Sequence, residues 1–182
     1  MGRCQGAGGS VSLERMPRFV LLWHACPSSY GKSDPKGSHW DFLLEDGGAL
    51  ATWNLFELPS AWNKSVLNEG AAKPKAAGIA AGQRPAGARP DELANSRIVA
   101  AEKIQDHRLA YLDYEGPITS ENPENRASVD KGSVERIDGG EYRLLERSET
   151  LWRVELAGEF LQGIVELRFL QEGDWRLEVG SP

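Results

Sequence analysis

Short apolar stretches separated by turn residues run along most of the chain. The stretches at 18–25, 39–45 and 49–55 are rich in Phe, Val, Leu and Trp, and Gly47-Gly48 between the last two is typical of a hairpin turn. Gly139-Gly140 is expected to mark another turn, between two of the later strands. Those later strand-like stretches lie at 97–104, 128–137, 141–147, 151–156, 163–170 and 175–179. Almost no stretch has the 3.6-residue period of a helix, so the pattern predicts a mainly β fold, an antiparallel barrel or sandwich.

Two parts of the chain lack a sustained apolar pattern. Residues 1–17 contain no signal-peptide core and are expected to form a disordered N-terminal tail, with Met1 and Met16 both open as the true start. Residues 64–96 contain 9 Ala, 4 Gly and 3 Pro. Such a segment buries too little apolar surface to offset the entropy of ordering it. We therefore expect one domain over 18–180 with a mobile Ala/Gly/Pro-rich insertion at 64–96.

Composition narrows the class of protein. The 182 residues are 40% hydrophobic, enough for one core. No apolar run reaches the roughly 18 residues of a membrane-spanning helix, so no membrane partner is expected. With 21 Lys and Arg against 27 Asp and Glu, the net charge of −6 argues against a broad basic surface for nucleic acid, but a local basic pocket is compatible with it. Cys4 and Cys26 are too few to staple the domain, which predicts a reduced, cytoplasmic protein.

Histidine is scarce, and His24, His39 and His107 all lie within or beside strand-like segments. His39 and Asp41 are two residues apart, so an extended strand places both on one face while Trp40 points to the other. An imidazole and a carboxylate at this spacing can bind one cation. The third ligand would be His24 or His107, from another strand. The plain alternative is a solvated strand face on which the carboxylate only orients the imidazole.

Two imidazoles and one carboxylate suit two chemistries. In the first, a divalent ion such as Mn²⁺ acts as a Lewis acid on a phosphoryl oxygen while a phosphate ester is cleaved. In the second, His39, Asp41 and His107 hold Fe(II) as the facial triad of a non-haem oxygenase. The spacing of the residues does not separate the two.

Two blocks of the sequence resemble a known family. The first is His39-Trp40-Asp41-Phe42-Leu43-Leu44-Glu45, followed by an acidic-glycine turn and Trp53. It is similar to the pattern His-Tyr-Asp-Phe-Arg-Leu-Glu of the 3′-phosphoesterase domain of bacterial DNA ligase D. The second block, Asp106-His107-Arg108-Leu109-Ala110-Tyr111, is similar to that family's Asp-His-Pro-Leu-Asp-Tyr. With weaker matches toward the C-terminus, the resemblance spans about residues 18–179.

The resemblance implies a fold, a cofactor and a set of roles. The fold would be a compact antiparallel β-barrel with few short helices. Its pocket would bind manganese and remove phosphate or a ribonucleotide from the 3′ end of a nucleic acid during DNA repair. By position, His24, His39 and Asp41 would be the metal ligands, and His107 and Tyr111 would contact the phosphate. Ligase and polymerase activities would belong to separate partner chains, and a small phosphate ester is the other substrate class.

One departure from the family pattern concerns the phosphate itself. Leu43 stands where the family has Arg, so a guanidinium on the face of His39 and Asp41 is missing. Loss of such a donor predicts weaker catalysis, which makes a metal-binding module that holds nucleic-acid ends without efficient turnover the alternative. The candidate replacements for the missing charge are Arg18, Arg97, Arg108 and Arg126.

Overall fold

The computed structural model describes residues 15–27, 37–62, 97–118 and 131–180. Most of the expected tail, residues 1–14, and the expected insertion at 64–96 lie outside this part of the chain. The strands are β1 (Arg18–Ala25), β2 (His39–Asp46), β3 (Ala49–Leu55), β4 (Ile98–Lys103), β5 (Gly116–Pro117), β6 (Ser133–Arg147), β7 (Leu151–Gly158), β8 (Gln162–Gln171) and β9 (Asp174–Val179). Helical residues are few among those described: the 3-10 turn η1 (Leu109–Leu112) and a short turn at 60–62.

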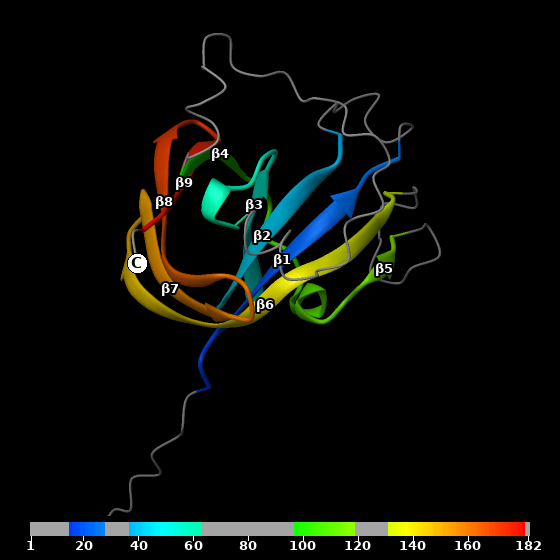
Figure 1. Ribbon diagram of the computed structural model, residues 1–182, viewed down its shortest axis with the longest axis horizontal. Coiled ribbons are helices and arrows are strands. Elements are labelled where there is room, and N and C mark those ends of the chain that lie inside the picture. The colour runs from blue at the N-terminus through cyan, green and yellow to red at the C-terminus, as the bar shows by residue number, and fades with distance from the viewer. Residues whose placement is uncertain (1–14, 28–36, 63–96, 119–130, 181–182) are drawn as a thin grey trace, which may run out of the picture.

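Eight of the strands close into an antiparallel barrel (Figure 1). Their order is β1-β2-β3-β4-β9-β8-β7-β6, and β6 pairs again with β1 to complete the ring, while β5 extends β6 outside it. Closure leaves none of these eight strands with an unpaired edge along its whole length. The expectation of a mainly β, antiparallel barrel with few short helices is confirmed.

Alternating side chains divide the barrel wall into an inner and an outer face. On β2, Phe42 and Leu44 belong to the inner core, while Asp41 and Leu43 point outward. At the centre of the core, Trp53 is fully buried with edge-on ring contacts to Trp152 and Trp175 at centroid distances of 5.5 and 5.7 Å. The inner face thus carries the stabilising aromatic core.

A second, smaller apolar cluster covers the outer face beside the candidate site. It consists of Val20, Leu22, Leu43, Leu50, Leu112, Ile118 and Val134, with Tyr111 and Tyr114 packed against it. Because Leu112 and the two tyrosines come from the segment around η1, this cluster fixes that segment against β1 and β2. Leu43 therefore has a packing role: it is fully buried where the family pattern has a charged side chain.

The expected turn at Gly139-Gly140 is wrong, because β6 runs through both residues. The two glycines lie where β6 is paired with β1 on one side and begins to pair with β7 on the other. A Cβ atom on Gly140 would lie 2.2 Å from the carbonyl oxygen of Ala157, and one on Gly139 would lie 2.9 Å from that of Phe19. Glycine is present here because neighbouring backbones approach closely.

Candidate metal and phosphate site

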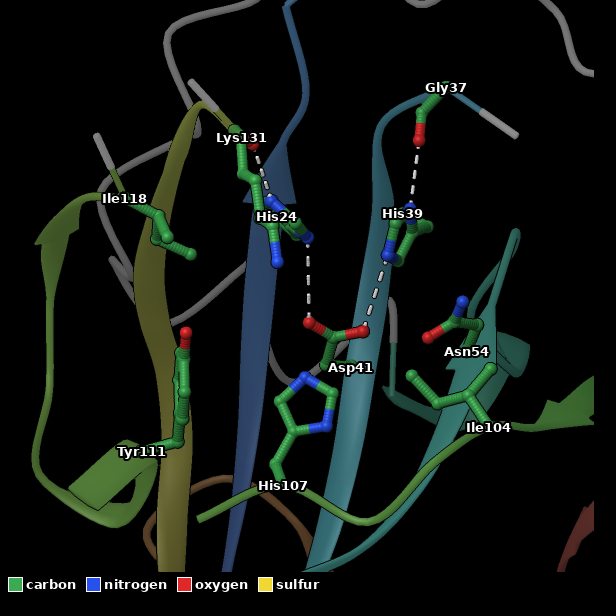
Figure 2. A pocket seen from close by; sticks show the side chains of 10 residues that line it. All are labelled: His24, Gly37, His39, Asp41, Asn54, Ile104, His107, Tyr111, Ile118 and Lys131. Atoms are coloured by element: carbon green, nitrogen blue, oxygen red, sulfur yellow. Dashed lines mark hydrogen bonds and ion pairs between the residues drawn. The ribbon is translucent and has the colours of Figure 1, made fainter. Parts of the chain in front are cut away.

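A cavity of about 230 Å³ lies between the outer face of β1–β3 and the chain that carries η1 (Figure 2). All five residues singled out from the sequence line it, although His107 and Tyr111 are more than 60 residues further along the chain than His24, His39 and Asp41. The lining residues are His24, Gly37, His39, Asp41, Asn54, Ile104, His107, Tyr111, Ile118 and Lys131. The fold therefore brings the scarce imidazoles and the carboxylate to one place.

The pairing of β1 with β2 places three of these side chains. His24 is directly opposite His39 in the antiparallel register, and their rings lie 5.0 Å apart, edge to face. Asp41 is two residues further along β2, on the same face. Its Oδ1 lies 3.3 Å from His39 Nε2, and its Oδ2 lies 3.7 Å from His24 Nδ1.

His107 and Tyr111 approach from the opposite side of the cavity. His107 is fixed against β3 by two backbone hydrogen bonds with Leu50, of 2.8 and 2.9 Å. Tyr111 follows one turn later in η1, and the two rings are in edge contact at 5.1 Å. Figure 2 shows the His107 ring directed at the Asp41 carboxylate and the Tyr111 hydroxyl directed into the cavity.

Each imidazole uses one ring nitrogen to hold its own orientation. His24 Nε2 donates to the Lys131 carbonyl at 2.8 Å, and His39 Nδ1 donates to the Gly37 carbonyl at 2.8 Å. His107 Nδ1 donates to the Gln105 carbonyl at 3.1 Å. A carbonyl oxygen only accepts, so these contacts fix the protonated nitrogen and direct the other nitrogen of each ring elsewhere. Metal-binding histidines are oriented in this way.

Asp41 supplies the test of whether a cation fits here. The residue is 3% exposed, and its Oδ1 makes no hydrogen bond of good geometry within the described chain, although it approaches His39 Nε2 at 3.3 Å. A buried carboxylate is costly unless its charge is balanced, and a bound cation would balance it in place of a proton on His39. The donor set of two or three imidazole nitrogens and one carboxylate oxygen fits a divalent transition metal.

Cys26 belongs to the same group of side chains and was missed in the sequence. One ligand atom from each of His24, Cys26 and His39 lies within 4.8 Å of the others, so these residues form a cluster that could hold a metal ion. The signal was available, because His24 and Cys26 have the same two-residue spacing as His39 and Asp41.

Mutual contacts shift the titration of this cluster. Burial alone raises the pKa of the Cys26 thiol, but contacts with His24 and His39 outweigh it and lower the pKa to about 7. Burial lowers the pKa of His39, but its contacts with Asp41 and Cys26 raise that pKa to about 10. The pKa of His107 is lowered, mainly by burial, so this ring is neutral near pH 7. Without a metal, His39 is therefore an imidazolium near pH 7 whose Nε2 faces Asp41, and a bound cation would take the place of that proton. His107, on the other side, is neutral.

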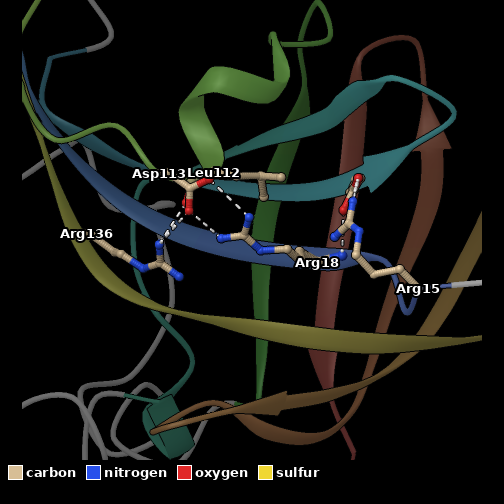
Figure 3. Close-up of polar contacts among 6 residues, drawn as sticks. Arg15, Arg18, Leu112, Asp113 and Arg136 are labelled. Atoms are coloured by element: carbon tan, nitrogen blue, oxygen red, sulfur yellow. Dashed lines mark hydrogen bonds and ion pairs between the residues drawn. The ribbon is translucent and has the colours of Figure 1, made fainter.

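Of the arginines proposed to replace the missing guanidinium, those within the described residues, Arg18, Arg97 and Arg108, do not line the cavity. Arg18 instead donates to Asp113, and Arg136 donates to the Leu112 carbonyl at 2.8 Å (Figure 3). These contacts fasten the end of η1 to β1 and β6. Arg97 bonds to the Gly180 carbonyl, and Arg126 lies outside the described residues.

Lys131 is the one Lys or Arg among the residues that line the cavity. Its side chain extends past His24 toward the interior of the cavity in Figure 2. Its ammonium forms no hydrogen bond or ion pair within the described part of the chain. Lys131 was missed in the sequence, because it stands within the strand-like stretch at 128–137, outside both matching blocks.

The comparisons add no relative to this picture. No family model matches the chain, and no curated protein matches it significantly. Within the described residues, none of the helices has the length and apolar character needed to cross a membrane. The fold and the site define the protein as a closed eight-stranded barrel with a cavity on its outer face that is lined by three histidines and a carboxylate, two of these histidines also clustering with Cys26.

Proposed function

We propose that the pocket binds a divalent metal ion and hydrolyses phosphate esters, with the 3′ end of a nucleic acid as the substrate. The observation that supports this most directly is the buried Asp41 carboxylate, whose Oδ1 has no well-formed hydrogen bond within the described chain and which faces three imidazoles with fixed orientations. His24, His39 and Asp41 would hold the ion, for which Mn²⁺ is the proposed identity. When bound, the ion supplies positive charge to the phosphoryl oxygens.

The remaining polar side chains would bind the phosphate from the other side. The neutral His107 imidazole keeps Nε2 for a hydrogen bond or a proton, and the Tyr111 hydroxyl lies beside it in the cavity. Lys131 supplies the positive charge that Leu43 cannot. These three groups would orient the phosphate and stabilise the charge that develops on its oxygens.

The size of the cavity favours a terminal phosphate over a whole nucleotide. Pockets that enclose drug-sized ligands are about 300 to 1,000 Å³, and this cavity is about 230 Å³. That volume suits a metal ion with one phosphoryl group, so the alcohol to which the phosphate is attached would stay outside. The protein has a net charge of −6, which favours contact with the end of a nucleic-acid strand over contact along the length of its phosphate backbone.

The direct test compares oligonucleotides that end in a 3′-phosphate with the same strands ending in a 3′-hydroxyl. Metal-free protein is titrated with Mn²⁺, and metal binding, strand binding and phosphate release are measured separately. We expect release that requires both the protein and the metal. Metal binding with end-specific association but no release, also absent with simple phosphate esters, would instead identify a binding module. Absence of metal binding would overturn the proposal.

Substitution of Lys131 by Ala should lower kcat/KM for phosphate release by about 100-fold, because one charged donor to the phosphate is lost. Metal affinity should stay unchanged, since Lys131 contacts the ligand set only through its backbone carbonyl. Lys131→Arg should recover part of the loss. Arg97→Ala is the matched control for loss of one positive charge, and it should behave as the unmodified protein. Equal losses in both Ala variants would remove Lys131 from the site.

A further inference from the structure

We infer that the Cys26 thiolate is a further ligand of the ion held by His24 and His39, and that the site therefore binds Zn²⁺ in preference to Mn²⁺. The inference rests on the metal pocket of the proposed function and concerns which ion occupies it. A sulfur ligand changes the ion expected in the pocket from Mn²⁺ to Zn²⁺, because Mn²⁺ was proposed for the ligands His24, His39 and Asp41, which contain no sulfur.

The positions of the donor atoms are close to those of a metal centre. Sulfur and nitrogen ligands bind zinc at about 2.3 and 2.1 Å, so neighbouring donors in a tetrahedral site lie about 3.5 Å apart. The donor atoms of His24, Cys26 and His39 all lie within 4.8 Å of one another. They therefore need to approach by little more than about 1 Å, which small side-chain rotations supply.

The backbone holds Cys26 at this place from two sides. Its amide N–H donates to Ser38 Oγ at 3.1 Å, which ties it to the residue before His39. On the other side, Gly132 contacts the backbone of Ala25, the residue before Cys26. The contact is so close that a Cβ atom on Gly132 would lie 1.9 Å from the Ala25 carbonyl oxygen. These contacts hold the backbone of Cys26 next to the end of β1 that carries His24 and the start of β2 that carries His39.

The second independent indication is the carboxylate that faces the same imidazoles. Asp41 is only 3% exposed, and its Oδ1 has no well-formed hydrogen bond within the described chain. A thiolate and a carboxylate together balance the charge of one divalent ion. The clustered donors are two nitrogens and one sulfur, and Asp41 would add an oxygen if it moved toward the sulfur side. Such a set is typical of zinc, whereas Mn²⁺ favours oxygen-rich sites.

Cobalt titration tests the ligand directly, without reference to activity. Co²⁺ replaces Zn²⁺ in such sites, and a cobalt–thiolate bond gives a charge-transfer absorption in the near ultraviolet. We expect this band in the unmodified protein and in Cys4→Ser, which removes the other cysteine of the chain. The band should be absent in Cys26→Ser and Cys26→Ala. Circular dichroism of both Cys26 variants checks that they fold.

Competition between Zn²⁺ and Mn²⁺ in chelator-buffered solution gives the second readout. The preference for Zn²⁺ should fall by at least about ten-fold in Cys26→Ser, with Mn²⁺ affinity nearly unchanged, because sulfur contributes chiefly to the softer ion. Cobalt binding without the thiolate band, and an unchanged preference in Cys26→Ser, would overturn the inference while leaving a metal-dependent pocket. Absence of binding by all three ions would instead overturn the proposed function, and this inference with it.

Discussion

Replacing Asp41 by Asn is expected to weaken divalent-metal binding by at least about 100-fold and to abolish metal-dependent phosphate release. Loss of a group that only orients a metal ligand costs about 10- to 100-fold in affinity, and loss of the charged ligand itself should exceed this. The substitution keeps the shape of the side chain, so the barrel should fold. Isothermal titration with Mn²⁺ and Zn²⁺, together with phosphate release, measures the effect.

Thermal unfolding with and without metal separates this role from a purely structural one. In the unmodified protein, a metal at 100 times its Kd should add about 2.7 kcal/mol to the free energy of unfolding. Asp41→Asn should lose that increment. Asp46→Asn is the matched control on the same strand, where the carboxylate pairs with Arg147 at the surface, and it should retain the increment. If metal stabilises neither the unmodified protein nor Asp46→Asn, Asp41 serves only as the partner of His39.

Replacing Trp53 by Ala should lower the free energy of unfolding by about 3 to 5 kcal/mol. The side chain is fully buried, and it lies between Trp152 and Trp175 with Lys103 Nζ 5.1 Å from its ring centroid. Its removal leaves a cavity that these rigid neighbours cannot fill. Since domains have only about 5 to 15 kcal/mol of stability, much of the total would be lost. Denaturant unfolding followed by circular dichroism measures the change.

Two further variants test the reason for that loss. Trp53→Phe should cost much less, because it keeps an aromatic ring and removes an indole N–H that is buried without an acceptor. Phe169→Ala removes another ring in contact with Trp175, but one that is 36% exposed, and should cost about 1 kcal/mol or less. A loss in Trp53→Phe as large as in Trp53→Ala would mean that the N–H has a stabilising role.

Local alternation was sufficient to predict the face of β2 that carries the site. Side chains alternate between the two faces of a strand, so His39 and Asp41 must lie on one face of β2 and Phe42 and Leu44 on the other. The many short strands predicted an antiparallel barrel or sandwich, and the family resemblance implied the barrel. The scarcity of histidine made His107 one of two candidates for the third ligand, but a place for Tyr111 in the same cavity could be expected only from the resemblance.

Other features depend on pairing that a linear pattern does not contain. Two successive glycines such as Gly139 and Gly140 are typical of a turn. Here they lie within a strand, because a side chain at either position would clash with the backbone of Phe19 or Ala157. Lys131 reaches the cavity because β6 begins beside β1, which is a tertiary relation. Cys26 is different: its spacing from His24 was visible, and it was passed over because cysteines were considered only as disulfide partners.

The pairing of β1 with β6 has a consequence for how the protein reaches its native state. Phe19 is opposite Gly140, a partner about 120 residues later in the chain, and such distant contacts slow the folding of small β proteins. His24 is on β1, whereas its hydrogen-bond acceptor, the Lys131 carbonyl, lies two residues before the start of β6. The imidazole is therefore oriented only after β1 and β6 have paired, so the proposed metal site is incomplete in a chain in which these two strands are still apart.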